Sequence, residues 1–301
     1  MNAGKYVFSQ LVSFLPKRVF DGIVKRHEGD KWVKDFNCWN QLLVIMFGQP
    51  AGCDSLRKVA AIIDAIRDYK IFEEFAFHMI NLAQSKSITM PFVLNGKFYA
   101  FDSITINLCI CLFAWAYFRK TKSGIKVHTL FAVVTKIPTY IQITETKPHD
   151  VNAMDEIPYE PNAFYIFDKG YYDLARLYRI QSIGSTFIIR SNDFTIKVKD
   201  IAMLYKQRWQ VELFFSWIKQ HLRVLSFWGT SENAVRMQIY VAVITYCLVA
   251  IVEHDCELGR TTFNVLRVLS RVLTDKTSSR DLFKGSETIE DTDDETVQLQ
   301  F

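Results

Sequence analysis

Four polar residues in the second half of the sequence have a spacing that could hold a charged ligand. Tyr205, Arg208, Glu212 and Lys219 follow one another at steps of three, four and seven residues. On an α-helix they would fall within an arc of about 60°, while most residues around them are apolar. Buried charge is costly unless it is paired, so this stripe needs a partner. One option is internal, because Arg208 and Glu212 stand at i and i+4 and can pair.

The same four residues form the pattern Y-x2-R-x3-E-x6-K, written here as YKQRWQVELFFSWIK without a gap. This pattern resembles the signature of the DDE transposases of bacterial insertion sequences, in the subgroup marked by a Tyr-Arg-Glu-Lys motif. The resemblance implies that Glu212 is the last of three metal-binding carboxylates. It also implies that Tyr205, Arg208 and Lys219 contact DNA, the two cations through its phosphates.

Two aspartates upstream complete the set that this family uses. Asp102 follows the apolar run FYAF and precedes Ser103, close to the family's Asp-Ser-Thr, and Asp168 opens DKGY, like the family's Asp-(Arg/Lys)-Gly-Tyr. Each also has a structural interpretation. Asp102 could be a turn residue after a strand, and Asp168 could be the N-cap of a helix that starts near Tyr171. Their order ahead of the Glu212 motif favours the catalytic interpretation.

Three carboxylates suit the reaction that the resemblance implies, which is the cleavage and rejoining of DNA strands. Breaking a phosphodiester requires activation of a water or a terminal hydroxyl and stabilisation of the leaving oxygen. Two divalent ions about 4 Å apart supply both functions, and carboxylate oxygens are their usual ligands. We therefore expect Mg²⁺ at Asp102, Asp168 and Glu212, with Mn²⁺ as a substitute.

Further basic residues lie beside a predicted strand. The segment GIKVHTL carries Lys126 and follows a basic turn that ends at Lys122, and the family has a similar basic segment. Phosphate contact is the expected role of Lys122 and Lys126. His149 and Asp150, in another segment that resembles the family, are interpreted as structural.

The periodicity of the sequence predicts the elements that position these residues. Residues 1–90 repeat apolar positions at three- and four-residue steps, which is typical of helices. Short β-branched and aromatic runs predict strands within 92–101, 124–134, 139–146, 163–167 and 185–190. Helices are expected over 171–181 and from 198 to about 273. This α/β order, together with the resemblance, predicts a ribonuclease-H-like mixed sheet flanked by helices, with helical N- and C-terminal regions.

The predicted domains are a helical DNA-end-binding region over 1–90, a ribonuclease-H-like core with C-terminal helices over 91–284, and an acidic disordered tail over 285–301. The tail holds six acids and no base, so the rest of the chain is more basic than the net charge of +4 suggests. That balance is compatible with a polyanionic partner. The resemblance implies double-stranded DNA, as the element's terminal inverted repeats and as target DNA, bound by a homodimer.

Four basic residues beside the first helical pattern have two interpretations. Lys17, Arg18, Lys25 and Arg26 could form an ordinary solvated helix face or could contact DNA. The apolar run 237–252 is shorter than the roughly 20 residues that span a membrane, which favours a buried core helix and no membrane partner. Six cysteines without zinc-binding spacing, and no apolar signal segment at the start, favour a reduced protein of the cytoplasm. The resemblance implies a bacterial protein that is associated with the nucleoid.

Two stretches are shorter than in the family. The connection from Arg190 to Tyr205 lacks the β-rich insertion that usually precedes the glutamate, and the segment after Lys70 lacks a longer basic helical part. Both would remove DNA-contacting surface and leave the carboxylates in place. The leading hypothesis is a transposase, from a copy that could be shortened, that nicks DNA and transfers the freed 3′-hydroxyl, with a hairpin route suggested by the resemblance. The alternatives are an inactive DNA-binding remnant and a general nuclease.

Overall fold

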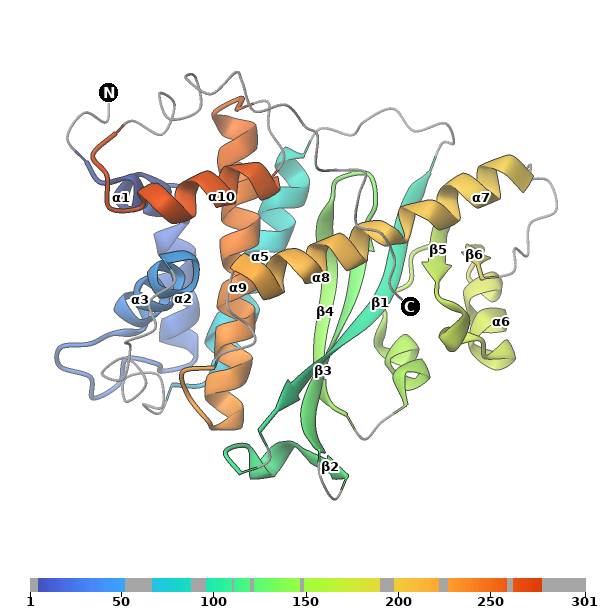
Figure 1. Ribbon diagram of the computed structural model, residues 1–301, viewed down its shortest axis with the longest axis horizontal. Helices are drawn as coiled ribbons and strands as arrows, with labels where there is room; N and C mark the ends of the chain where they lie inside the picture. Colours follow the sequence, from blue (N-terminus) through green and yellow to red (C-terminus); the bar gives the residue numbers. More distant parts are fainter. Residues whose placement is uncertain are drawn as a thin grey trace.

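A central sheet with helices on both sides forms the framework of the protein (Figure 1). The computed structural model describes residues 5–51, 67–87, 96–109, 111–119, 122–146, 149–189, 198–221, 227–258 and 262–277. The fold class predicted from the sequence, a mixed sheet flanked by helices with helical N- and C-terminal regions, is confirmed. The predicted acidic tail lies outside the described residues.

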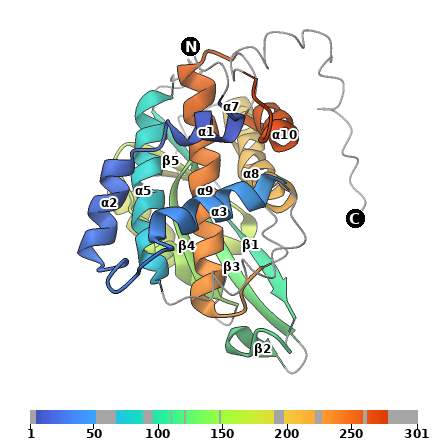
Figure 2. The same ribbon diagram turned by 90° about the vertical axis from the view of Figure 1, so that its left-hand side faces the viewer.

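The N-terminal region is helical, as its apolar periodicity predicts. Its described helices are α1 (Val7–Val12), α2 (Lys17–Arg26), α3 (Cys38–Ala51) and α5 (Tyr69–Lys86). α2 is amphipathic and buries Phe20, Ile23 and Val24. α5 begins at an N-cap, where the Asp68 carboxylate accepts a hydrogen bond of 2.9 Å from the Lys70 N–H. α5 then runs beside the long helix α9 (Glu232–Asp255), as Figure 2 shows.

The described strands form one sheet. They are β1 (Lys97–Leu108), β2 (Tyr117–Arg119), β3 (Lys122–Ala132), β4 (Ile137–Glu145), β5 (Ala163–Phe167) and β6 (Thr186–Ile188). β3 pairs antiparallel with β1, β2 and β4, whereas β5 pairs parallel with β1 and β6. Parallel neighbours need a crossover connection. Between β5 and β6 that crossover contains α6 (Leu174–Ser182).

Side chains of β1 alternate between two hydrophobic clusters, one on each face of the sheet. Phe98, Ala100 and Ile106 join the larger cluster with α5, α9 and α8 (Trp209–His221). Tyr99 and Phe101 join a smaller cluster with α6 and the 3-10 helix η2 (Asp150–Glu156). The larger cluster also contains residues of α1, α2 and α3, so the N-terminal helices and the sheet share one continuous core.

α9 occupies the middle of the helical side and packs against α5, α3 and α10 (Thr262–Val272). Among the described residues, it alone is long and apolar enough to cross a membrane by length and composition. However, 89% of its apolar window is buried inside the protein. The helix is therefore packed as a core helix, as predicted for the apolar run 237–252.

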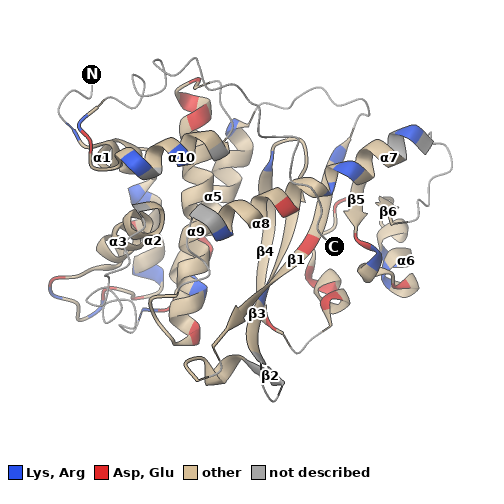
Figure 3. Ribbon diagram, in the orientation of Figure 1, with Lys and Arg blue, Asp and Glu red and all other residues tan. Residues whose placement is uncertain are grey.

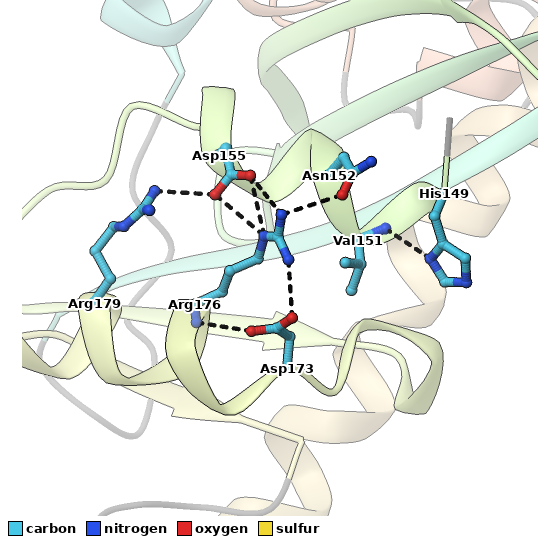
Figure 4. Close-up of polar contacts among 7 residues, drawn as sticks. All are labelled: His149, Val151, Asn152, Asp155, Asp173, Arg176 and Arg179. Carbon is cyan, nitrogen blue, oxygen red and sulfur yellow. Dashed lines mark hydrogen bonds and ion pairs between the residues drawn. The ribbon is translucent and has the colours of Figure 1, made fainter. Parts of the chain in front are cut away.

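On the opposite face, a charged network fixes α6 to η2 (Figure 4). The Arg176 guanidinium donates to the carboxylates of Asp155, at 2.6 Å, and Asp173, at 2.9 Å. Arg179 also donates to Asp155, at 3.0 Å. The Asp173 side chain accepts from the Arg176 N–H and forms the N-cap of α6. This network holds the helix that follows the predicted site residue Asp168.

Two predicted helices have different bounds in the structure. The segment predicted as a helix over 171–181 starts at Leu174, after the short 3-10 helix η3 (Lys169–Tyr171). The helix predicted from 198 onward is not continuous around the motif. It divides into α7 (Val198–Gln207) and α8, and Arg208 lies in the turn between them.

Candidate active site

Asp102 lies in the middle of β1 and faces α8. The prediction that a strand ends at this residue is wrong, because β1 continues to Leu108 and Asp102 pairs with Thr129 of β3. By the alternation of the strand, Asp102 shares the face of Ala100 and Ile106, which α8 covers. Asp102 is only 8% exposed, and its Oδ1 accepts a hydrogen bond of 2.8 Å from the Ser103 N–H.

Arg208 joins this strand to the two halves of the motif helix. Its N–H bonds the Tyr205 carbonyl at 3.1 Å, and its own carbonyl accepts from the Val211 N–H at 3.1 Å, so the chain forms a tight turn here. From this turn, Arg208 Nη1 lies 2.5 Å from Asp102 Oδ2 and 3.5 Å from Glu212 Oε1. The internal pair that the sequence allowed, Arg208 with Glu212, is present, and Asp102 is a second and closer partner.

Asp168 follows directly after β5, the parallel neighbour of β1. Phe101 of β1 pairs with Phe167 of β5, and the next residues are Asp102 and Asp168, so the two aspartates are neighbours in register. The Asp168 side chain is the N-cap of η3 and accepts from the Gly170 N–H at 3.4 Å. The predicted N-cap role is therefore present, but for η3, since Asp173 caps α6. In the described structure, Asp168 makes no hydrogen bond or ion pair with Asp102, Arg208 or Glu212.

The electrostatics nevertheless connect all three carboxylates. Burial raises the pKa of the Asp102 carboxyl to about 7, and the negative charge of Glu212 also raises it. The hydrogen bond from the Ser103 N–H and the charge of Arg208 lower this pKa but do not outweigh burial. Burial lowers the pKa of Arg208, but the charges of Asp102, Asp168 and Glu212 raise it above its ordinary value. One guanidinium thus balances the acidic charge of three separate elements, β1, α8 and the end of β5.

The donor atoms fit the metal that the resemblance implies only in part. Asp102 and Glu212 offer carboxylate oxygens to a shared cation, which fits the charge and donor preference of Mg²⁺ or Mn²⁺. Glu212 also lies in the first turn of α8, where the helix dipole stabilises a negative charge. Among the described residues, however, no group of three Asp, Glu, His or Cys side chains is arranged to hold a metal ion. Two of the three predicted ligands are brought together, and Asp168 is their neighbour by strand register.

The residues predicted to contact DNA have different surroundings. The Tyr205 ring lies against the Arg208 guanidinium, 5.9 Å from ring centre to carbon, and Lys219 lines a small apolar cavity between the sheet and α8. Lys126 lies on the other face of the sheet from Asp102, where its ammonium pairs with Asp150 at 2.6 Å. Its side chain is 14% exposed, so it is not a free surface cation. Lys122 starts β3, but its side chain lies outside the described residues.

An exposed apolar stripe beside these charges was not predicted. Tyr205, Trp209 and Leu213 stand at four-residue steps on α7 and α8 and are 38%, 51% and 46% exposed. The sequence signal was available, because this four-residue spacing places them on one side of the helix. Their neighbours Val211, Phe214 and Phe215 are buried in the core. This exposed apolar stripe thus lies on the two helices that meet at Arg208.

Comparison with known families gives two matches along the chain. The model described as the transposase DDE domain matches residues 98–248, which include Asp102, Asp168 and Glu212. A model described as a domain of unknown function (DUF4372) matches residues 3–69. The first of these covers half of the chain and contains β5, α7, α8 and all but the first residue of β1.

Individual relatives carry related names. A candidate transposase of Sinorhizobium fredii, y4zB, is 28% identical over 223 residues, covering 54% of this chain and 62% of the relative. A probable transposase for insertion sequence element IS5377 of Geobacillus stearothermophilus is 23% identical over 205 residues, covering 49% and 54%. A candidate transposase for IS4SA of Synechocystis is 25% identical over 266 residues, covering 70% and 76%. The chain spans less than two thirds of the length of the first two.

Proposed function

Because the chain belongs to the DDE transposase family, we propose that it cleaves DNA at the ends of an insertion sequence and transfers the freed strands. The observation that carries the proposal is the cluster around Arg208. A strand and a helix far apart in sequence bring Asp102 and Glu212 to one cation, and the charge of Asp168 acts on the same cation. The proposed catalytic residues are these three carboxylates.

The proposed ligands of a divalent ion are Asp102, Asp168 and Glu212. When bound, Mg²⁺ or Mn²⁺ would activate the attacking oxygen and stabilise the leaving one. The chain's own contribution is to hold the carboxylates on β1, β5 and α8. α8 covers Asp102 on β1, and this burial would also keep bulk water from one side of the reacting phosphate.

The proposed DNA contacts follow the Tyr-Arg-Glu-Lys signature. Arg208 can donate two parallel hydrogen bonds to a phosphate, and the Tyr205 ring supports its guanidinium. Lys219 would add a second cation on α8. Lys122 is proposed to contact a phosphate of the DNA. Lys126, which pairs with Asp150, is proposed to contact the same DNA beside it on β3. Since Asp102 holds Arg208 in the described structure, DNA binding would move the guanidinium from a carboxylate to a phosphate.

The remaining proposals concern partners and organisation. The substrate is double-stranded DNA, as terminal inverted repeats and target, bound by a homodimer through a helical DNA-end-binding region over 1–90. We propose that residues 91–284 form the ribonuclease-H-like core with its C-terminal helices. The proposed location of the protein is the nucleoid in the bacterial cytoplasm. A 3′-hydroxyl freed by nicking would attack the next phosphodiester, and a hairpin at the transposon end is the proposed route.

A second candidate function is a DNA-binding remnant without cleavage activity. One observation favours it: no three-residue metal-binding group is formed among the described side chains. A remnant would bind DNA with an affinity that falls steeply with salt, and Mg²⁺ would leave the DNA intact.

Cleavage of a plasmid that carries the gene with its flanking DNA tests the proposal. The wild-type protein should nick this plasmid with Mg²⁺ or Mn²⁺ and should leave a plasmid without the flanking DNA intact. A general nuclease would cut both plasmids. Asp102→Asn, Asp168→Asn and Glu212→Gln should each abolish nicking and leave DNA binding largely intact. Glu156→Gln, an exposed acid on the other face of the sheet, is the control. DNA binding without nicking by the wild type would establish the remnant.

A further inference from the structure

The loop between α2 and α3 presents a tryptophan to solvent. Trp32 is 91% exposed, more than any other large apolar side chain in the described part of the chain. Its backbone is left-handed, with φ at +67°, a conformation that costs free energy for a bulky residue. Neither the exposed indole nor the strained backbone of Trp32 stabilises the fold, and such backbone strain is typical of functional positions.

This loop is braced at both ends rather than loosely attached. At its start, Gly29 packs so closely on α5 and Cys38 that a Cβ atom there would lie 2.9 Å from Cys38 Sγ. The Asp30 carboxylate accepts a hydrogen bond of 2.7 Å from the Cys38 N–H. At its end, buried Arg67 donates to the Phe36 carbonyl. The tip is therefore a fixed projection that carries Trp32 outward.

Charges of α2 and of the loop after it, which carries Trp32, favour a polyanion. Several cations of this segment are neutralised, since Lys31 pairs with Glu28, Lys17 with Asp21 and Arg26 with Glu74. Three exposed cations of α2 and the loop after it make no ion pair in the described structure: Arg18, Lys25 and Lys34. One exposed acid of the loop, Asp35, makes none either. Arg18 and Lys25 are seven residues apart on α2 and share one side of it. Figure 3 shows the basic positions along α2.

We propose that Trp32 and these three cations form a second DNA contact, in which the indole stacks on a base or enters between base steps. The proposal rests on the proposed function, that the chain acts on DNA. It adds that a DNA base is the group that the helical region contacts through Trp32. Arg18, Lys25 and Lys34 would contact phosphates and supply the salt-dependent part of binding. The loop lies at the opposite end of the molecule from α7 (Figure 1), so it would hold DNA away from the cleaved phosphate.

Binding of a fluorescein-labelled duplex from the flanking DNA tests this contact by fluorescence anisotropy. Stacking is worth about 1–3 kcal/mol per base, so Trp32→Ala should weaken binding roughly 5- to 150-fold. Trp32→Phe should retain most of the affinity. A triple variant, Arg18→Gln, Lys25→Gln and Lys34→Gln, should reduce the slope of affinity against salt, which Trp32→Ala should leave unchanged. Tyr178→Ala, an aromatic 73% exposed on α6, is the matched control.

A 2-aminopurine scan along the duplex locates the contact, because stacking changes the fluorescence of one position and Trp32→Ala should abolish that change. Wild-type affinity in Trp32→Ala, with an unchanged melting temperature, would overturn the inference even if the carboxylate variants lose cleavage as proposed. Unchanged DNA affinity with lost self-association would also overturn it, in favour of a protein contact. No DNA binding by the wild type would instead refute the proposed function.

Discussion

The Arg208 guanidinium lies 2.5 Å from the Asp102 carboxylate and ties the middle of β1 to the turn between α7 and α8. Both side chains are largely buried, at 17% and 12% exposed. A buried acid needs a counter-charge, and here the chain supplies one of its own. The position that a divalent ion would fill beside Asp102 and Glu212 therefore already has a positive charge next to it.

This arrangement predicts that Arg208 competes with metal ions in the absence of DNA. Arg208→Gln removes the positive charge and should tighten Mn²⁺ binding roughly fivefold or more, because each charge contact is worth at least about 1 kcal/mol. Isothermal titration of Mn²⁺ into the DNA-free protein measures the change. Lys206→Gln removes one exposed cation from the same helix pair and should have little effect. Equal or weaker Mn²⁺ binding by Arg208→Gln would show that the arginine organises the carboxylates instead of competing.

Most strands were predictable because their patterns are local, although the short strand β2 was not predicted. The run AFYIF gives β5 with the bounds found in the structure, and the alternation of β1 places Asp102 on the opposite face from Phe101. The same alternation separates Lys126 from its neighbours Ile125 and Val127, which lie on the α8 face. That signal could have predicted that Lys126 faces η2.

Other features depend on contacts between distant residues. The break at Arg208 could not be predicted from periodicity, because the stripe of the motif continues through it without a Gly or Pro. The turn accompanies the ion pair with Asp102, which is 106 residues away in sequence. Likewise, an isolated strand pattern does not tell that β1 extends to Leu108, since its pairing with β3 over Leu108 and Ser123 decides that end.

His128 predicts a loss of stability in mild acid. Burial lowers its pKa to about 4 from an ordinary 6.5, with Lys126 acting in the same direction and Asp150 against it. The unfolded chain therefore binds a proton more readily than the folded one, so the free energy of unfolding should fall as pH drops from 6.5 to 4, by up to about 3 kcal/mol. Urea denaturation across this range measures the fall. His128→Gln should flatten it, whereas His149→Gln, at an exposed position, should not.

The Asp155 network predicts a smaller effect of the same kind. The hydrogen bond from Arg176 is the main cause that lowers the pKa of Asp155, and Arg179 adds to it. The contribution is present above the ordinary pKa of an aspartate and should be lost as pH falls through the lower folded value. Because the side chain is 34% exposed, Asp155→Asn should cost only about 0.5–1 kcal/mol at neutral pH. Thermal denaturation measures this cost. Asp21→Asn, which removes only the exposed pair with Lys17, should cost less in the same measurement.

Two glycines of the N-terminal region should respond to alanine in opposite directions. At Gly29, a Cβ atom would contact Cys38 Sγ at 2.9 Å and overlap Ile71, so Gly29→Ala should destabilise the protein by about 1–3 kcal/mol. At Gly22, inside α2, the nearest atom would be Arg26 Nη1 at an ordinary 3.8 Å. Gly22→Ala should therefore stabilise the helix by about 0.5–1 kcal/mol. Urea midpoints of both variants compare directly with wild type. A neutral Gly29→Ala would mean that the loop carrying Trp32 can shift without cost, which contradicts its bracing.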